Sequence, residues 1–421
     1  MAVSAAEIPE GAGHAAAIRE APAGEAPARE VPAREAPVRR RPRDRKAQLV
    51  AAAARLFWEH GYPQVGMADI AGAVGIGASA LYRHFRGKGE LLAAVLTESL
   101  TELERVLAGS TELDARLRGT AAVVLAHREY AALWDRAPGQ LPARELAELT
   151  ARHRAVLAGL TDTVAGALAE RGVTEPAEVV LRTRAVSSVL ESPSRHRTHL
   201  DPDDFVALLH RAATSVLTEP LPASGARTGR GTPKDPQLPV SRREALLAAA
   251  CALFAERGYS AVSLDDIGAA IGIAGPSVYN HFPSKADVLL SVLHRGNEAL
   301  WFALHQALAA AEGPSDALGR VLDSYITIMA GNPEIITVLV NEAASLPGEL
   351  AEDFRRTQRA YVAEWVALLR RSRAELSEPA ARVLVHTALG LVNSLCRSRP
   401  SPGRLTFEAD LGAVCRAALR A

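Results

Sequence analysis

The sequence predicts an all-α protein built from two tandem units, and three observations support this. One stretch recurs later in the chain at a constant offset of 197 residues, and apolar residues follow a helical spacing over most of the length. The composition is rich in Ala, Leu, Arg and Glu, which favour helix. With 421 residues, 48% of them hydrophobic, the chain can bury two substantial cores.

The repeated stretch runs from Arg45 to Leu92 and again from Arg242 to Leu289. Aligned without a gap, about 21 of the 48 positions are identical, several times the level expected by chance. The sequence therefore indicates a duplication.

Each copy has the pattern of three short helices. From Ala47, apolar residues fall at i, i+3, i+4, i+7 and i+8, which defines one helix face, and Gly61 ends that helix. A second helix of about two turns precedes Gly75, which suits a left-handed turn, and a third helix begins near Ala78. Helix, glycine turn and helix form a helix-turn-helix.

The third helix has an outward face that suits a DNA groove. Leu81 and Phe85 lie four residues apart and are expected to face inward. The outward residues are small where a backbone must approach closely, and they form hydrogen bonds where phosphates or base edges lie. They are Ser79, Ala80, Tyr82 and Arg83 in the first copy, and Pro276, Ser277, Tyr279 and Asn280 in the second.

On these residues, both copies resemble the DNA-binding domain of the tetracycline-repressor (TetR) family. The shared pattern in the first copy runs from Phe57 through Gly61, Gly75 and Tyr82 to Lys88. The resemblance implies phosphate contacts from the tyrosines and lysines, whereas a packing role for the tyrosines and a surface role for the lysines are the alternative. The expected DNA-binding residues within the copies are Ser79, Ala80, Tyr82, Arg83, His84 and Lys88, and Arg242, Arg243, Ser263, Ser277, Tyr279, Asn280, His281 and Lys285.

Charge distinguishes the two copies. A basic cluster that includes Arg41, Arg43 and Arg45 precedes the first helix, and we expect it to contact phosphates or the minor groove. From residue 39 to 92 there are about ten basic and four acidic residues, against about five and six from 233 to 290. Because phosphate neutralisation supplies most sequence-independent affinity, the first copy is expected to bind DNA more strongly.

Helix caps distinguish them in the opposite sense. Ser263 with Asp266, and Ser284 with Asp287, have the spacing of capping boxes. The first copy has Gly66 and Gly87 at these positions, where the TetR family usually has serine or threonine. The cost of a glycine cap is only a few tenths of a kcal/mol relative to serine, so the first copy is still expected to fold.

The rest of the chain divides around these copies. Residues 1–38 read as a disordered Ala/Pro/Glu/Arg tail, and 219–240 as a Pro/Gly/Ser/Thr linker. The first helix-turn-helix domain is assigned to 39–92 and the second to 241–290. Helical patterns follow at 93–218 and 291–421, and the resemblance implies that each such domain binds a ligand and contributes its last two helices to a four-helix dimer interface.

Scattered aromatic and apolar residues are candidates for a ligand pocket, although each suits an ordinary core as well. An aliphatic pocket would suit a small apolar effector such as an acyl chain or acyl thioester. The candidates are Trp134, Trp301, Phe302, Tyr325, Val338, Tyr361 and Trp365.

The sequence favours a binding protein over an enzyme. It has no nucleophile, metal or phosphate-loop constellation, so no catalytic residue, metal or cofactor is expected. The three cysteines lie in apolar helical patterns and are expected as buried thiols. With no membrane-length apolar run and no secretory segment, a cytoplasmic location without membrane association is expected.

These features predict a DNA-binding transcriptional regulator, most simply a repressor released by its effector. Its partners would be a double-stranded operator and the small apolar effector. The two halves are expected to pair as an intramolecular pseudo-dimer, with a homodimer of tandem chains as the alternative. A competing prediction is a ligand- or protein-binding module in which one or both helix-turn-helix units no longer bind DNA.

Overall fold

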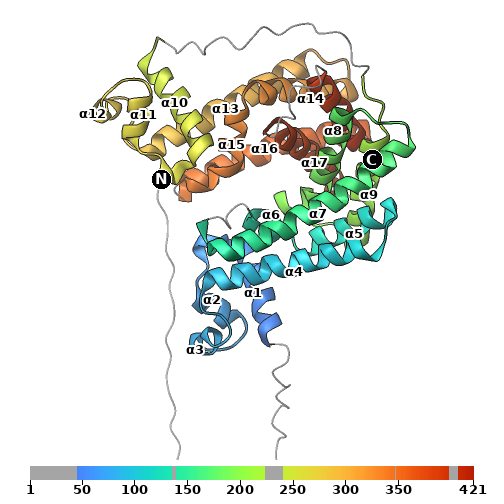
Figure 1. Cartoon of the computed structure of the whole chain (residues 1–421). Helices are drawn as coiled ribbons and strands as arrows, with labels where there is room; N and C mark the ends of the chain where they lie inside the picture. The colour runs from blue at the N-terminus through green and yellow to red at the C-terminus, as the bar shows by residue number, and fades with distance from the viewer. Residues whose placement is uncertain (1–44, 135–138, 223–239, 347, 398–405) are drawn as a thin grey trace, which may run out of the picture. The chain divides into compact units, whose positions relative to one another are not determined.

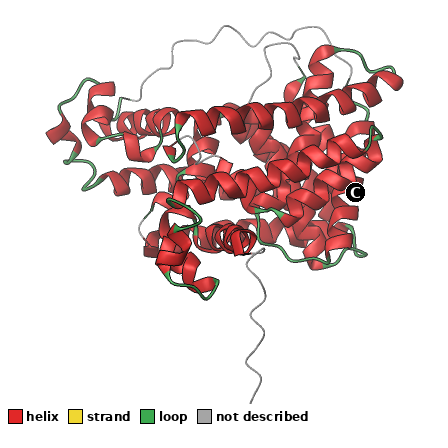
Figure 2. Cartoon of the chain, turned by 60° about the horizontal axis from the view of Figure 1, so that its bottom comes forward, coloured by secondary structure: helices red, strands yellow, loops and turns green. Residues whose placement is uncertain are grey.

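The structure is a computed structural model that describes residues 45–134, 139–222, 240–346, 348–397 and 406–421. In this part of the chain every regular element is an α-helix or a short 3₁₀ turn, as Figure 2 shows. The all-α prediction is confirmed. The predicted tail at 1–38 and most of the predicted linker lie outside the described residues.

The first three helices of the first half lie where the sequence predicts them, and further helices follow. Its elements are α1 (Arg45–His60), η2 (Tyr62–Gln64), α2 (Met67–Ala73), α3 (Ala78–Tyr82), α4 (Lys88–Gly109), α5 (Leu113–Ala126), α6 (Glu129–Trp134), α7 (Ala143–Glu170), α8 (Pro176–Glu191), η4 (Ser192–Arg195) and α9 (Pro202–Thr218) (Figure 1).

The second half repeats this order of α-helices, whereas the second of its two 3₁₀ turns lies at a different place. Its elements are α10 (Arg242–Arg257), η5 (Tyr259–Ala261), α11 (Leu264–Ala270), α12 (Gly275–Val278), α13 (Lys285–Ala309), α14 (Pro314–Gly331), α15 (Pro333–Asn341), η6 (Ala343–Ser345), α16 (Gly348–Ser372), α17 (Glu378–Arg397) and α18 (Phe407–Leu419). Helices α1 to α3 are called the first module below, and α10 to α12 the second module.

Each module has its own hydrophobic core. The first is built around Leu49, Phe57, Ile70 and Leu81, and it extends into α4 and α7. The second is built on the corresponding residues Leu246, Phe254, Ile267 and Val278, and it extends into α13, α15 and α16. The same apolar positions therefore fold both copies in the same way.

The third and largest core is shared between the two halves. Helix α8 packs against α17 and α9 against α18, and α8, α9 and α17 lie side by side near the C-terminus (Figure 1). Small residues such as Ala212 and Ala418 are fully buried there and let the helices approach closely. Polar contacts also cross the boundary: the buried hydroxyl of Thr387 donates to Ser192 Oγ over 3.1 Å, and Arg420 pairs with Glu219 at 2.6 Å.

Two further predictions concern composition. Cys251, Cys396 and Cys415 are all buried, and none of the three is in a disulfide, as expected. Among the described helices, none combines the length and apolar character that a membrane span requires.

Candidate nucleic-acid interface

The glycine turns of both modules have the predicted geometry. Gly61 and Gly75 have φ of 83° and 68°, and their counterparts Gly258 and Gly272 have φ of 78° and 72°. These left-handed values favour glycine because a Cβ would be strained there. The turn after α2 is closed by hydrogen bonds from Gly75 N to Gly72 O and from Ile76 N to Ala71 O, both 3.0 Å, which fixes the angle at which α3 leaves.

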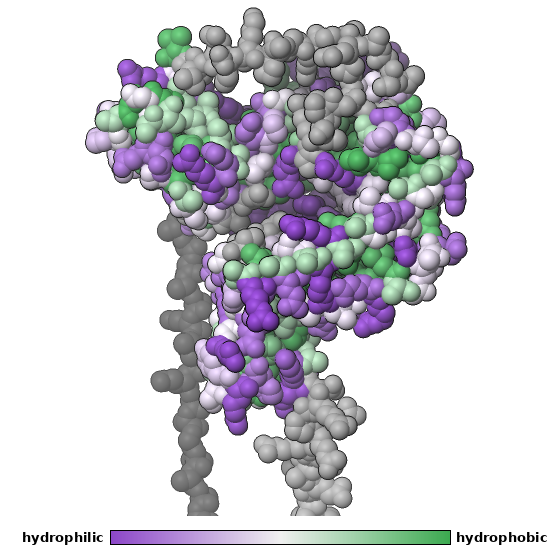
Figure 3. Space-filling model, viewed as in Figure 1, coloured by the Kyte–Doolittle hydropathy of each residue, from purple (hydrophilic) through white to green (hydrophobic). Residues whose placement is uncertain are grey.

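The third helix of each module presents the face that the sequence predicts. Leu81 and Phe85 are buried, whereas Tyr82 is 53% exposed, and Tyr279 is 58% exposed in the second module. Ser79, Arg83, His84 and Asn280 are also exposed, and Ala80, Ser277 and His281 are half-buried. In the view of Figure 3, hydrophilic residues gather over α2 and α3. The outward face is thus a polar surface with one large aromatic residue.

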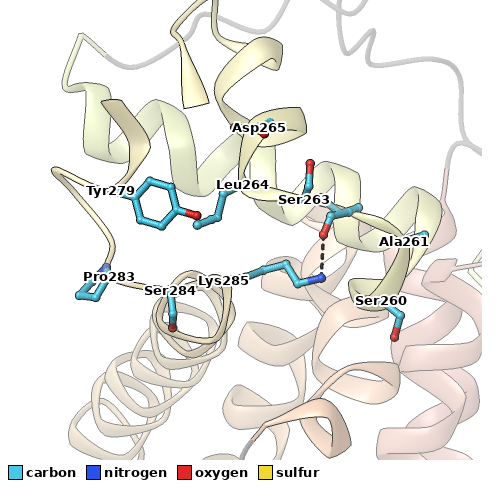
Figure 4. Close-up of a pocket in the computed structure, with 10 residues that line it drawn as sticks. Ser260, Ala261, Ser263, Leu264, Asp265, Tyr279, Pro283, Ser284 and Lys285 are labelled. Atoms are coloured by element: carbon cyan, nitrogen blue, oxygen red, sulfur yellow. Dashed lines mark hydrogen bonds between the residues drawn. The ribbon is translucent and has the colours of Figure 1, made fainter. Parts of the chain in front are cut away.

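In the second module, three predicted DNA-binding residues line one cleft of about 520 Å³, shown in Figure 4. Ser263 precedes α11, Tyr279 follows α12, and Lys285 begins α13, so the fold brings them together from three elements. Ser284 lines the same cleft. A cleft with hydroxyl groups and a lysine beside a recognition helix suits a phosphate oxygen of a duplex backbone.

The serine hydroxyls are already engaged in helix caps. Ser263 Oγ donates to Asp266 Oδ2 and accepts a 3.1 Å bond from Asp266 N, while Ser284 Oγ does the same with Asp287. The predicted capping box at Ser263 is therefore complete, and at Ser284 the serine side chain caps α13. In the first module, Gly66 N donates to Asp69 Oδ2 over 2.8 Å, but the N-cap residues Gly66 and Gly87 have no side chain that could cap α2 or α4.

Lys88 and Lys285, which occupy equivalent positions in the two copies, have a structural role that the sequence did not predict. Lys285 Nζ donates to Tyr259 O at 2.9 Å and Val262 O at 2.7 Å, and it lies 4.3 Å from the Tyr259 ring centre. Lys88 Nζ lies 4.2 Å from the Tyr62 ring and 3.4 Å from Pro63 O. Burial lowers the pKa of Lys88, and the Asp69 carboxylate partly offsets this.

Each lysine thus ties the turn after the first helix to the start of the fourth. The signal in the sequence was the recurrence of Gly-Tyr and, 26 residues after the tyrosine, of Lys in both copies.

An acidic group distinguishes the second module from the first. Asp265 lines the cleft, and its Oδ1 lies 1.5 Å from where a Cβ on Gly275 would be. The carboxylate therefore covers the first turn of α12, which only glycine permits. At the equivalent positions the first module has Ala68 and Ala78.

The basic residues before each module occupy different positions. Arg41 and Arg43 lie outside the described residues, while Arg45 donates to Val74 O over 3.4 Å and so contacts the turn between α2 and α3. Arg242 and Arg243 are exposed, and the guanidinium of Arg243 lies 4.6 Å from the ring centre of Phe282.

Of the seven candidates for the ligand pocket, Tyr325 and Tyr361 line a cavity of about 990 Å³, to which both halves contribute lining residues. Trp301 and Trp365 pack around these tyrosines. The other three lie elsewhere: Val338 in the core of the second module, Phe302 at the surface with 67% exposure, and Trp134 stacked on His153 in the first half.

Comparison with known proteins finds similarity in the same segments. Residues 49–95 and 246–292 each match the family described as "Bacterial regulatory proteins, tetR family". Residues 311–408 match "Tetracyclin repressor-like, C-terminal domain". The two matches at the N-terminal domain coincide with the duplicated stretch.

Among curated proteins, the transcriptional activator FasR of Mycolicibacterium smegmatis is 35% identical over 107 residues, covering 25% of this chain and 47% of FasR. The repressor KstR2 of the same organism is 32% identical over 127 residues, covering 30% of this chain and 62% of KstR2. The matches thus span about half to under two thirds of these relatives. The solved structure of KstR2 from Mycobacterium tuberculosis is 22% identical over 43% of this chain and 94% of its own, with a TM-score of 0.39.

Proposed function

We propose that this chain, which belongs to the TetR family of bacterial regulatory proteins and carries two of its N-terminal units, is a DNA-binding transcriptional regulator. The relatives include an activator and a repressor. Repression that is relieved by a small effector is the mode we propose, because ligand binding can favour a state whose recognition helices no longer fit one duplex.

One observation carries this proposal: in both copies a large aromatic residue, Tyr82 or Tyr279, is more than half exposed at the C-terminal end of a short helix whose opposite face is buried. A bulky side chain held outward on a rigid helix, with small and polar neighbours, suits contact with a duplex backbone. The two tyrosines are 197 residues apart, which is the offset of the duplication, so the same arrangement occurs in both copies.

We propose that the first module supplies most of the affinity for DNA. Beside its recognition helix it has Ala68 and Arg86, where the second module has Asp265 and Pro283. A carboxylate close to a phosphate is repulsive, and each phosphate contact by a cation adds about 0.9 to the slope of affinity against salt.

The helix packing between the halves supports an intramolecular pseudo-dimer. Helices α8 and α9 share one core with α17 and α18, and these are the helices for which the resemblance implies a dimer interface. Because the two recognition helices differ in sequence, the operator would have unequal half-sites rather than a perfect inverted repeat.

Selection of bound DNA fragments with the intact chain tests the function. The expected product is a fragment with two unequal half-sites; Tyr82→Ala should remove enrichment of one and Tyr279→Ala weaken enrichment of the other. Phe302→Ala is the matched control, because it also removes an exposed aromatic side chain but lies on α13. Equal enrichment with all three variants would contradict the proposed interface.

The second candidate function is a ligand- or protein-binding module whose DNA contacts have lapsed. The zero net charge and the acid beside the second recognition helix favour it. A gel shift on DNA upstream of its own gene separates the two functions, since absence of binding even at about 50 mM salt supports this second candidate.

A further inference from the structure

The cavity of about 990 Å³ is formed by both halves of the chain. Its second-half walls come from α13 to α17, and the segment Ser194–Thr198, which follows α8 of the first half, lines it from the other side. This volume is at the upper end of the range for small-molecule sites. A ligand bound here would touch both halves at once.

One part of the second-half wall is apolar. It is formed by aliphatic side chains together with Tyr325 and Tyr361, and Tyr325 OH donates to Asn393 Oδ1 over 2.9 Å, which leaves the ring faces to form the wall. The aliphatic members include Leu300, Met329, Ile336, Leu339, Val362 and Leu389. This surface suits an apolar ligand body.

The remainder of the lining is polar, and its charged residues are mostly arginines. Five arginines line the cavity, against Glu342 as the acidic residue among the lining residues. Arg355 and Arg359 share the single carboxylate of Glu352, and the guanidinium of Arg197 contacts backbone carbonyls instead of an acid. Counting also the paired acids Glu191, Glu352 and Glu378, five positive charges face four negative ones.

The first-half segment also has buried polar atoms that its contacts with the protein leave unpaired. Ser194 Oγ, His196 Nε2 and Thr198 Oγ1 are buried and have no hydrogen-bond partner among the described residues. Thr198 N donates to His196 Nδ1 over 3.3 Å, so Nε2 carries the proton and is a donor without an acceptor. Buried donors are nearly always paired in folded proteins, and a ligand acceptor would pair with Nε2 only after the side chain turns, because this atom has almost no accessible surface.

The same segment is joined directly to the first module. Arg197 Nη2 donates to Trp58 O at 2.8 Å and Glu59 O at 3.0 Å, the last carbonyls of α1, and the guanidinium lies 5.7 Å from the Trp58 ring centre. A cation suits this end of a helix, where carbonyls are unpaired and the dipole is negative. Movement of Arg197 toward an anion would remove these bonds.

On the other side, α15 connects the cavity to the second module. Ile336 and Val340 of this helix line the cavity, while Val338 is fully buried in the core of the second module. Ser260, in the turn that precedes α11, also lines the cavity. Both modules are therefore in contact with elements of the same cavity.

We propose that this shared cavity is the effector site, that its ligand is an amphiphile with an apolar body and an anionic carboxylate or phosphate head group, and that Arg197 transmits its occupancy to α1. Only the coupling to α1 through Arg197 rests on the proposed function; the cavity and its ligand class do not. The effector would have an anionic head group, which the aromatic candidates alone did not indicate. One ligand site would also act on both DNA-binding modules.

Calorimetric titration of the intact chain without DNA tests the ligand class. Decanoate and decyl phosphate are the anionic probes, and decanol is the neutral probe of equal chain length. We expect saturable binding of at least one anion, at least about tenfold tighter than decanol, and about one ligand per chain. Equal affinity for the anions and decanol, or no saturable binding of any probe, would overturn the proposal.

Variants on α16 locate the head-group site. Arg359→Gln and Arg355→Gln should weaken anion binding about tenfold and leave decanol binding within about twofold. Arg356→Gln is the matched control, since Arg356 is on the same helix, does not line the cavity and pairs with Asp353 at the surface. A similar loss in all three variants would contradict the site.

The coupling is tested with the operator fragment. The anion that binds should lower the affinity of the wild-type chain for the operator. In Arg197→Gln, the ratio of operator affinity without the anion to operator affinity with it should be within about twofold of one. Ligand binding without any DNA binding would contradict the proposed function but leave the site intact. An unchanged ratio in Arg197→Gln would contradict the role of Arg197.

Discussion

The clearest difference between the modules at the scale of single residues is the pair Asp265 and Gly275. The carboxylate covers the start of α12 because Gly275 has no Cβ, and the first module has alanine at both positions. Asp265→Ala is expected to raise affinity for DNA about fivefold at low salt, since a unit charge about 4 Å from a phosphate costs roughly 1 kcal/mol in water.

The reverse exchange is Ala68→Asp with Ala78→Gly, because the acid needs the glycine beside it. This double variant should weaken binding by a similar factor, and Ala78→Gly alone is its control. Gel shifts at two salt concentrations measure both effects. Asp265→Ala with unchanged affinity would show that the second module does not contact the duplex.

The two lysines at the start of α4 and α13 give a second prediction. Lys285→Met removes two short hydrogen bonds from an ammonium and should loosen the turn before α11 by about 1–2 kcal/mol. Lys88→Met removes one longer bond and should cost about half as much in the first module. Hydrogen exchange of the α2 and α11 amides in the intact chain measures both losses. Protection in both variants equal to that of the wild-type chain would contradict the structural role of these lysines.

At the scale of elements, the N-caps make the two modules unequal in local stability. Ser263→Ala or Ser284→Ala should each cost about 1 kcal/mol, whereas serine to glycine should cost only a few tenths. Gly87 has an extended backbone, so Gly87→Ser should fit and stabilise α4 slightly. The shift of the urea midpoint checks these values; a larger loss for glycine than for alanine would contradict the capping account.

How much the sequence could predict also differs between elements. Helices and the inward residues Leu81 and Phe85 were predictable because one apolar face repeats with the helical period. The pocket was not: Val338 and Phe302 have the chemistry of a pocket wall, but one is in a module core and the other at the surface. Which neighbour covers a helix face depends on tertiary packing, and residue type does not encode it.

Long-range polar contacts were equally hidden. Arg197 meets the end of α1 across 139 positions of sequence, and no period or motif marks that pair. By contrast, the serine caps of α11 and α13 were predictable from the sequence because their partners are three residues apart.

At the scale of the whole molecule, two stacked histidines connect the halves. The ring centres of His196 and His386 lie 4.5 Å apart. Burial lowers the pKa of His196 to about 2 and that of His386 to about 4. The neighbouring His386 lowers the pKa of His196 further, and Arg382 does the same to the pKa of His386. Both values are below the ordinary 6.5, so folding favours the neutral rings. Their contribution to the free energy of unfolding is complete above pH 6.5 and is lost as the pH falls towards 4.

Acidification should therefore weaken the contact between the halves. Between pH 7 and pH 5 the expected loss is roughly 2 kcal/mol for each imidazole. Urea unfolding at the two pH values measures it, and the His196→Gln/His386→Gln double variant should lose less over the same range. An equal loss in the variant would contradict this role.

The central claim is that one chain supplies both DNA-binding modules to one operator. Native mass spectrometry of the intact chain with its selected fragment, combined with footprinting, tests this most directly. The account predicts one chain per duplex, protection of two unequal half-sites, and loss of protection at one of them in Tyr82→Ala. Two chains bound to a perfect inverted repeat would contradict it.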